Sequence, residues 1–163
     1  NLIEREEFLK CKELIEEGKS IIIHGKAGYG KSGITQLIIQ YCEQKTIPHI
    51  AIKSDKRVPR DNVEEWSKKL GFPTSIGFCI DSISKDKNAV IILDQLDALR
   101  WTQSHSRDAL LVCTELIEQI KKINLERKNK ISIIFVCRTY DLENDTSIKL
   151  LFKDEKNDKI WKK

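Results

Sequence analysis

The sequence predicts an α/β fold in which a parallel sheet is covered by helices on both faces, giving three layers. Two observations support this prediction. Four short apolar runs rich in Ile and Val alternate with segments whose apolar residues recur at helical spacing. The runs are continuous rather than alternating, as expected for strands buried on both faces. This alternation of strand and helix favours right-handed crossovers and strands that all run the same way.

Each element is predicted from a local signal. Gly18 and Gly71 mark the ends of two helices, and Asp61 with Glu64 resembles a capping box that opens another. Strands are predicted at residues 21–24, 49–53, 89–93 and 131–136, with Ile160 and Trp161 beginning a fifth. Helices are predicted at residues 4–18, 31–44, 61–70, 75–85, 107–125 and 147–152.

Composition fits one domain that covers residues 1–163, with 40% hydrophobic and 33% charged residues, as in ordinary soluble proteins. No apolar run approaches the roughly 18 residues of a membrane span, and the first residues are charged rather than signal-like. A cytoplasmic location is therefore expected. The five cysteines are widely spaced and mostly embedded in apolar stretches, so we expect buried reduced thiols rather than disulfides or a zinc site.

A glycine-rich motif lies between the first predicted strand and the following helix. Residues 25–32 read GKAGYGKS and match the phosphate-binding pattern G-x-x-x-x-G-K-[ST] at every required position. Glycines let backbone N–H groups wrap phosphate oxygens, and the helix points its positive end at them. Lys31 is expected to contact the β- and γ-phosphates, and Ser32 to offer a hydroxyl to Mg²⁺. The expected nucleotide-binding residues here are Gly25, Lys26, Ala27, Gly28, Tyr29, Gly30, Lys31, Ser32 and Gly33.

Two further predicted strands end in polar residues. Asp94 follows a buried apolar run, as expected for an acid that helps to hold Mg²⁺. Gln95 stands where many hydrolytic relatives carry a glutamate, so the nearest acidic substitute is Asp97, whose alternative role is helix capping or surface exposure. Arg138 could reach the γ-phosphate as a sensor, or form a structural salt bridge to Asp141 or Glu143. Because parallel strands end at one edge of a sheet, these groups should meet there.

The net charge of +4 is spread over the chain, but two segments concentrate basic residues. One covers residues 53–60 (KSDKRVPR), and the other covers residues 126–130 (ERKNK). Each is expected in a surface loop, where a solvated face is the simpler interpretation. Contact with nucleic acid is the alternative, and no motif in the sequence supports it.

These motifs together resemble the STAND class of P-loop NTPases, a signalling branch related to AAA+ ATPases. The matching segments are residues 2–6 (LIERE), 25–32, 90–97 (VIILDQLD) and 136–139 (VCRT), although Glu4 stands where the family has glycine. The resemblance implies an ASCE-type P-loop fold with strand order 5-1-4-3-2, and it puts Arg5 near the base or ribose. It also implies a lid and a winged-helix region after the fifth strand. We therefore expect a fragment of a longer multidomain protein, with the fifth strand and the lid truncated.

The leading functional hypothesis is a nucleotide-dependent signalling switch that binds ATP or ADP with Mg²⁺ and hydrolyses ATP slowly. By the resemblance, it would self-associate in the full-length protein in response to a trigger, which could be a protein. One alternative is an AAA+-like ATPase that remodels DNA or protein. Another is a nucleotide-binding scaffold without turnover. Gln95 argues against fast hydrolysis.

Overall fold

The computed structural model describes residues 6–25, 31–54, 56–94, 103–138 and 158–162. None of the helices in these ranges combines the length and apolar character needed to cross a membrane. In chain order the elements are α1 (Glu6–Glu16), β1 (Ile21–Gly25), α2 (Lys31–Gln44), β2 (His49–Lys53), α3 (Val63–Lys69), α4 (Ile76–Ser84), β3 (Ala89–Asp94), α5 (Gln103–Leu125), β4 (Ile131–Arg138) and β5 (Asp158–Lys162).

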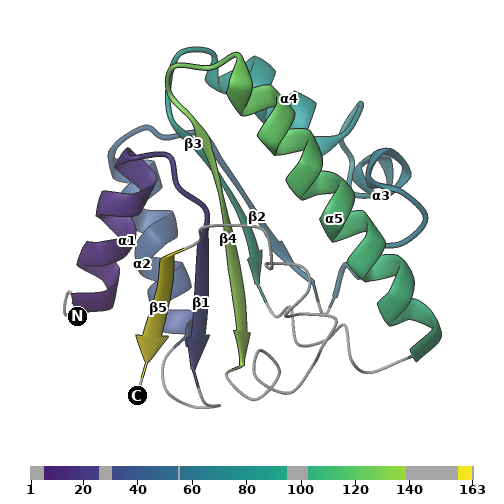
Figure 1. The fold of residues 1–163 in the computed structure, drawn as a ribbon, viewed down its shortest axis with the longest axis horizontal. Helices are drawn as coiled ribbons and strands as arrows, with labels where there is room; N and C mark the ends of the chain where they lie inside the picture. Colours follow the sequence, from purple (N-terminus) through teal and green to yellow (C-terminus); the bar gives the residue numbers. More distant parts are fainter. Residues whose placement is uncertain (1–5, 26–30, 55, 95–102, 139–157, 163) are drawn as a thin grey trace.

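All strand pairs in the sheet are parallel, and the strands stand in the order β2-β3-β4-β1-β5. Strand β1, which leads into the glycine-rich motif, therefore has a strand on each side. Strands β1 to β4 stand in the order 1-4-3-2, so the predicted arrangement of these four is confirmed. Figure 1 shows the strand arrows pointing the same way, with helices on both sides of the sheet.

Alternate residues of each central strand enter different layers of the core. In β1, Ile21 and Ile23 pack with α1 and α2, whereas Ile22 faces the layer of α3, α4 and α5. In β3, Ile92 and Ile91 divide in the same way, and all these side chains are fully buried. A strand needs apolar residues at every position when both of its faces are covered, which explains the continuous runs in the sequence.

The helix α3 begins one residue later than its predicted capping box. Asn62 is the N-cap, and its side chain accepts a hydrogen bond of 2.8 Å from the backbone N–H of Glu65. Asp61 instead has a positive φ of 65° and pairs with Lys69 at 2.6 Å. The prediction of Asp61 and Glu64 as the capping box was therefore wrong. Two adjacent residues can both cap a helix, and the backbone turn at Asp61 decides between them.

The fifth strand is longer than its predicted beginning at Ile160 and Trp161. It covers Asp158–Lys162 and pairs with β1 along all five residues of β1, from Ile21 with Asp158 to Gly25 with Lys162. The fifth strand was expected to be truncated, but it is long enough to pair with the whole of β1. The predicted helix at 147–152 lies outside the described residues.

The five cysteines are all free and buried, as predicted. Cys42 on α2 and Cys113 on α5 lie in opposite helix layers. Burial raises the pKa of the Cys113 thiol to about 12, and burial followed by the nearby Glu43 carboxylate raises that of Cys42 to about 12. Both thiols are therefore neutral near pH 7, and they serve as small apolar core residues.

Candidate nucleotide-binding site

Polar and glycine residues singled out in the sequence lie where parallel strands end. Gly25 at the end of β1 pairs in register with Arg138 at the end of β4. Asp94 at the end of β3 pairs in register with Lys53 at the end of β2. All four strand ends therefore meet at one edge of the sheet, which we call the carboxyl edge, and the prediction of a shared edge is confirmed for these backbone positions.

The two ends of the glycine-rich motif are held by the fold. Gly25 is the last residue of β1, and Lys31 is the first residue of α2. The buried side chains of Ile34 and Ile38 pack α2 against the sheet, so its amino terminus stays beside the end of β1. The unpaired N–H groups and the dipole at such a terminus attract anions. Residues 26–30, between these two ends, lie outside the described residues.

Asp94 is a buried acid at the carboxyl edge. Its residue is only 9% exposed, and its backbone carbonyl accepts a hydrogen bond of 2.8 Å from the N–H of Ser54. One strand, β4, separates β3 from β1. With strands about 4.8 Å apart, the end of β3 lies roughly 10 Å from the end of β1. That spacing leaves room for a phosphate group and its cation between Asp94 and the motif.

Several predicted site residues are not tested by this geometry. Arg5, Gln95 and Asp97 lie outside the described residues. For Arg138 the structure describes the backbone position at the end of β4, and both salt-bridge candidates, Asp141 and Glu143, lie outside the described residues. The choice between a γ-phosphate sensor and a structural ion pair for Arg138 therefore stays open.

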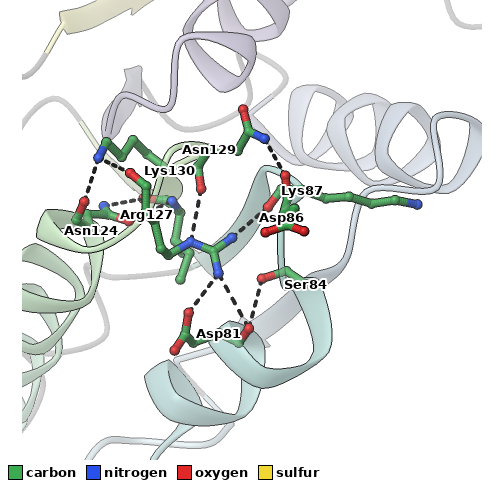
Figure 2. Close-up of polar contacts among 9 residues, drawn as sticks. Asp81, Ser84, Asp86, Lys87, Asn124, Arg127, Asn129 and Lys130 are labelled. Atoms are coloured by element: carbon green, nitrogen blue, oxygen red, sulfur yellow. Dashed lines mark hydrogen bonds and ion pairs between the residues drawn. The ribbon is translucent and has the colours of Figure 1, made fainter.

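One of the two basic segments, residues 126–130, uses two of its cations, Arg127 and Lys130, in contacts inside the protein. The Arg127 side chain is only 7% exposed and pairs with Asp81 of α4 at 2.7 Å (Figure 2). Its guanidinium also donates to the carbonyls of Lys87 at 2.6 Å and Asn129 at 2.9 Å. This cation joins the loop after α5 to the loop before β3.

Lys130 and Asn129 complete these contacts, as Figure 2 shows. The Lys130 ammonium donates to the carbonyls of Asn124 at 2.5 Å and Arg127, and the Asn129 amide donates to the carbonyl of Asp86. Residue spacing and charge do not indicate these bonds, because every acceptor but one is a backbone carbonyl. Arg127 and Lys130 are structural, which weakens the case for this segment as a nucleic-acid contact.

Comparisons with known proteins give likenesses of fold only. No family model and no curated protein matches the chain. A solved DNA replication initiation factor superposes with a TM-score of 0.61 at 18% identity, covering 100% of this chain and 48% of that chain. The Aeropyrum pernix ORC2 protein in its ADPNP–ADP complexes gives 0.53 at 11% identity, covering 96% and 45%. Its ADP form gives 0.51 at 13% identity, covering 95% and 46%.

These likenesses define the class of fold. The chain shares the parallel-sheet α/β fold of these solved proteins, with β1 inside the sheet rather than at its edge. It spans about half the length of the solved structures that it matches.

Proposed function

We propose that this chain is an ATP- or ADP-binding NTPase core. The observation that carries the proposal is a complete phosphate-binding motif whose ends coincide with the end of β1 and the start of α2. Buried Asp94 ends another strand at the same edge. Adenine is favoured because the ORC2 structures with this fold were solved with ADPNP and ADP.

In this proposal the residues divide by chemistry. The backbone N–H groups of Gly28, Gly30 and their neighbours surround the phosphate oxygens, because glycine lets the backbone approach closely. Lys31 adds a positive charge beside the β- and γ-phosphates. Arg5 would lie near the base or ribose, which follows from the family resemblance alone.

The donor set fits Mg²⁺. Ser32 supplies a hydroxyl and Asp94 a carboxylate, and Mg²⁺ prefers oxygen ligands, with the remaining positions taken by phosphate and water. Among the described residues there is no group of three or more His, Cys, Asp or Glu side chains arranged to hold a metal alone. A cation that shares its ligands with phosphate agrees with that finding. When bound, Mg²⁺ would neutralise phosphate charge.

We further propose slow hydrolysis and a switching role rather than rapid turnover. Gln95 lacks the carboxylate that would polarise an attacking water, and Asp97 is the nearest acid that could replace it. Arg138, in register with Gly25 and one strand away, is the candidate sensor of the γ-phosphate. Self-association, a protein trigger and a cytoplasmic location belong to this proposal and follow from the family resemblance and composition.

A second candidate is an AAA+-type ATPase that remodels DNA. It is favoured by one specific observation, which is that the solved proteins of this fold include a DNA replication initiation factor. In that case fast hydrolysis stimulated by DNA would be the output. Measured phosphate release with and without DNA separates this candidate from a slow switch.

Nucleotide titration of the chain tests the proposal. We expect Mg-ATP or Mg-ADP to bind, and Lys31→Ala to weaken binding about ten- to hundredfold, because a charge-assisted contact contributes about 1.5–3 kcal/mol. Calorimetry measures both affinities.

Lys45→Ala is the matched control, since Lys45 is exposed just beyond the other end of α2 and the substitution removes the same charge. It should leave nucleotide affinity unchanged. Equal affinities for wild type and Lys31→Ala would remove the basis of the assignment. Thermal unfolding of both variants checks that the fold is intact.

A further inference from the structure

The basic segment at residues 53–60 differs from the other basic segment in how its side chains are used. It follows β2 at the carboxyl edge. Its exposed cations alternate with buried residues. The exposed cations are Lys53, Lys56, Arg57 and Arg60, and the buried residues are Ser54 and Pro59.

The backbone of this segment is fixed at several points. The carbonyl of Lys53 accepts hydrogen bonds from the N–H groups of Lys56 at 3.1 Å and Arg57 at 3.0 Å, which closes a turn. The indole of buried Trp66 donates to the carbonyl of Arg57 at 3.2 Å. Ser54, fully buried, is tied to Asp94 of β3 through its backbone N–H. The exposed cations therefore project from an ordered support.

Two acids that follow the segment are paired with cations of α3 rather than with Lys53, Lys56 or Arg57. Asp61 pairs with Lys69 at 2.6 Å, and Glu64 lies 3.8 Å from Lys68. Within the described part of the chain, none of the ion pairs includes Lys53, Lys56 or Arg57. The cations of Lys53, Lys56 and Arg57 are therefore exposed over a short stretch of backbone, in which Asp55 lies outside the described residues.

We propose that Lys53, Lys56 and Arg57 form a sequence-independent contact for the phosphate backbone of nucleic acid. Separated cations on a fixed backbone suit a regularly charged polyanion. The favourable free energy of such binding comes from the release of counterions. The apolar residues of the segment point inward, since Pro59 is buried and Val58 packs against the core. The segment thus lacks the exposed apolar side chains that would insert into a membrane or anchor a protein interface.

The position of the contact gives it a further consequence. Lys53 is in register with Asp94, so nucleic acid bound at the segment would lie at the edge of the sheet that carries the proposed nucleotide site. The inference does not depend on nucleotide binding, because each can be measured in the absence of the other.

Fluorescence anisotropy tests this inference with the 163-residue chain and labelled DNA of mixed sequence. Probes of about 20 nucleotides, as single strand and as duplex, are titrated between about 50 and about 200 mM KCl. We expect binding that weakens as salt rises. The triple variant Lys53→Gln, Lys56→Gln, Arg57→Gln should bind duplex about tenfold or more weakly at low salt, and its salt slope should fall by about 2.7.

The charge-matched control is Lys45→Gln, Lys87→Gln, Lys128→Gln. These three lysines are exposed at the opposite edge, where the strands begin, so the net charge changes equally and the contact stays intact. The control should keep wild-type DNA affinity. Equal losses in both triple variants, or an absence of DNA binding by wild type at low salt, would overturn the proposal.

Two more measurements separate the remaining interpretations. A poly-glutamate chain of equal charge should compete weakly, and competition as strong as that of DNA would assign the segment to acidic proteins instead. Nucleotide titration of the 53/56/57 variant should match wild type. If Lys31→Ala leaves nucleotide affinity unchanged while the DNA results hold, the nucleotide proposal fails and the DNA contact stands.

Discussion

The two edges of the sheet use similar basic residues in opposite ways. Where the strands begin, Arg127 is nearly buried and its guanidinium is bound to Asp81 and to loop carbonyls. Where the strands end, Lys56 and Arg57 are exposed on a backbone that other residues hold in place. We call the first the closed edge, because Arg127 binds loop carbonyls there. We call the carboxyl edge the open edge, because Lys56 and Arg57 are exposed there.

This difference teaches that a basic run in a sequence does not by itself identify a binding surface. The deciding property is whether carbonyls from neighbouring loops lie within reach of the cation. An arginine can satisfy several buried carbonyls with one planar group, which makes it suited to joining loops.

The largest expected effect follows from Arg127→Met at the closed edge. The substitution keeps apolar bulk but leaves the Asp81 carboxylate and two loop carbonyls without their donor. We expect the free energy of unfolding to fall by about 3 kcal/mol, mainly because the loop carbonyls lose their donor, since the Asp81 carboxylate is partly exposed. Urea denaturation measures this.

Its neighbour Lys128 provides the control, because Lys128 is exposed. Lys128→Met should change the free energy of unfolding by less than about 0.5 kcal/mol. Similar stabilities for the two variants would show that the closed edge does not depend on Arg127.

A smaller effect is expected for Gly18→Ala, also at the closed edge. Gly18 has a φ of 71° after α1, and an added Cβ would lie 2.4 Å from the Cβ of Lys130. Strain and overlap together should cost about 2 kcal/mol. Gly71→Ala separates the two causes, since Gly71 has a φ of 102° but no atom within 4 Å of an added Cβ. It should cost about 1 kcal/mol, and an equal cost in both variants would exclude the overlap.

At the open edge, Asp94→Asn should weaken magnesium-dependent nucleotide binding about tenfold, or about 1.4 kcal/mol. The amide keeps the shape of the buried side chain and removes its charge, so affinity measured in EDTA should change little.

Asp97→Asn should lower phosphate release while nucleotide binding stays largely intact. Unchanged phosphate release in Asp97→Asn would remove Asp97 from the mechanism.

The core should give the smallest effect, and only at high pH. Burial raises the pKa of Cys113 from 9.0 to about 12, so the folded state keeps its proton where the unfolded chain loses it. The resulting stabilisation is complete below pH 9 and is lost as pH rises from about 9 to about 12. Cys113→Ala should therefore show a weaker decline in unfolding free energy between about pH 8 and pH 10 than wild type. Parallel curves for the two proteins would contradict the assignment.

Strand positions could be predicted from the sequence because each central strand is an almost continuous run of apolar residues. The bounds of β2 were predicted as observed, and β3 extends the predicted run by Asp94 alone. Short runs of β-branched residues favour strands that are buried on both faces. The shared location of Gly25 and Asp94 could also be predicted from the sequence. Both residues end strands, and the carboxyl ends of parallel strands lie at one edge of the sheet.

The N-cap of α3 and the roles of the basic segments could not be predicted, because several residues in the sequence are equally suited to each role. Asp61 and Asn62 are both good N-caps, and the choice was made by a backbone turn and by the pairing of Asp61 with Lys69. The different uses of the two basic segments depend on contacts such as that of Arg127 with the carbonyl of Lys87, far away in the chain. Such backbone acceptors cannot be predicted from residue type alone.

The place of β1 in the sheet also determines when it can be completed as the chain is made. Strand β1 pairs with β4 and β5, so Ile21 must wait for Ile134 and then for Asp158. The pairing of β2 with β3 joins residues much closer in sequence, such as His49 and Val90. Loop closure favours the nearer pair. Among the described strands, β1 therefore precedes the others during synthesis and gains its second neighbour after β2, β3 and β4 have found theirs.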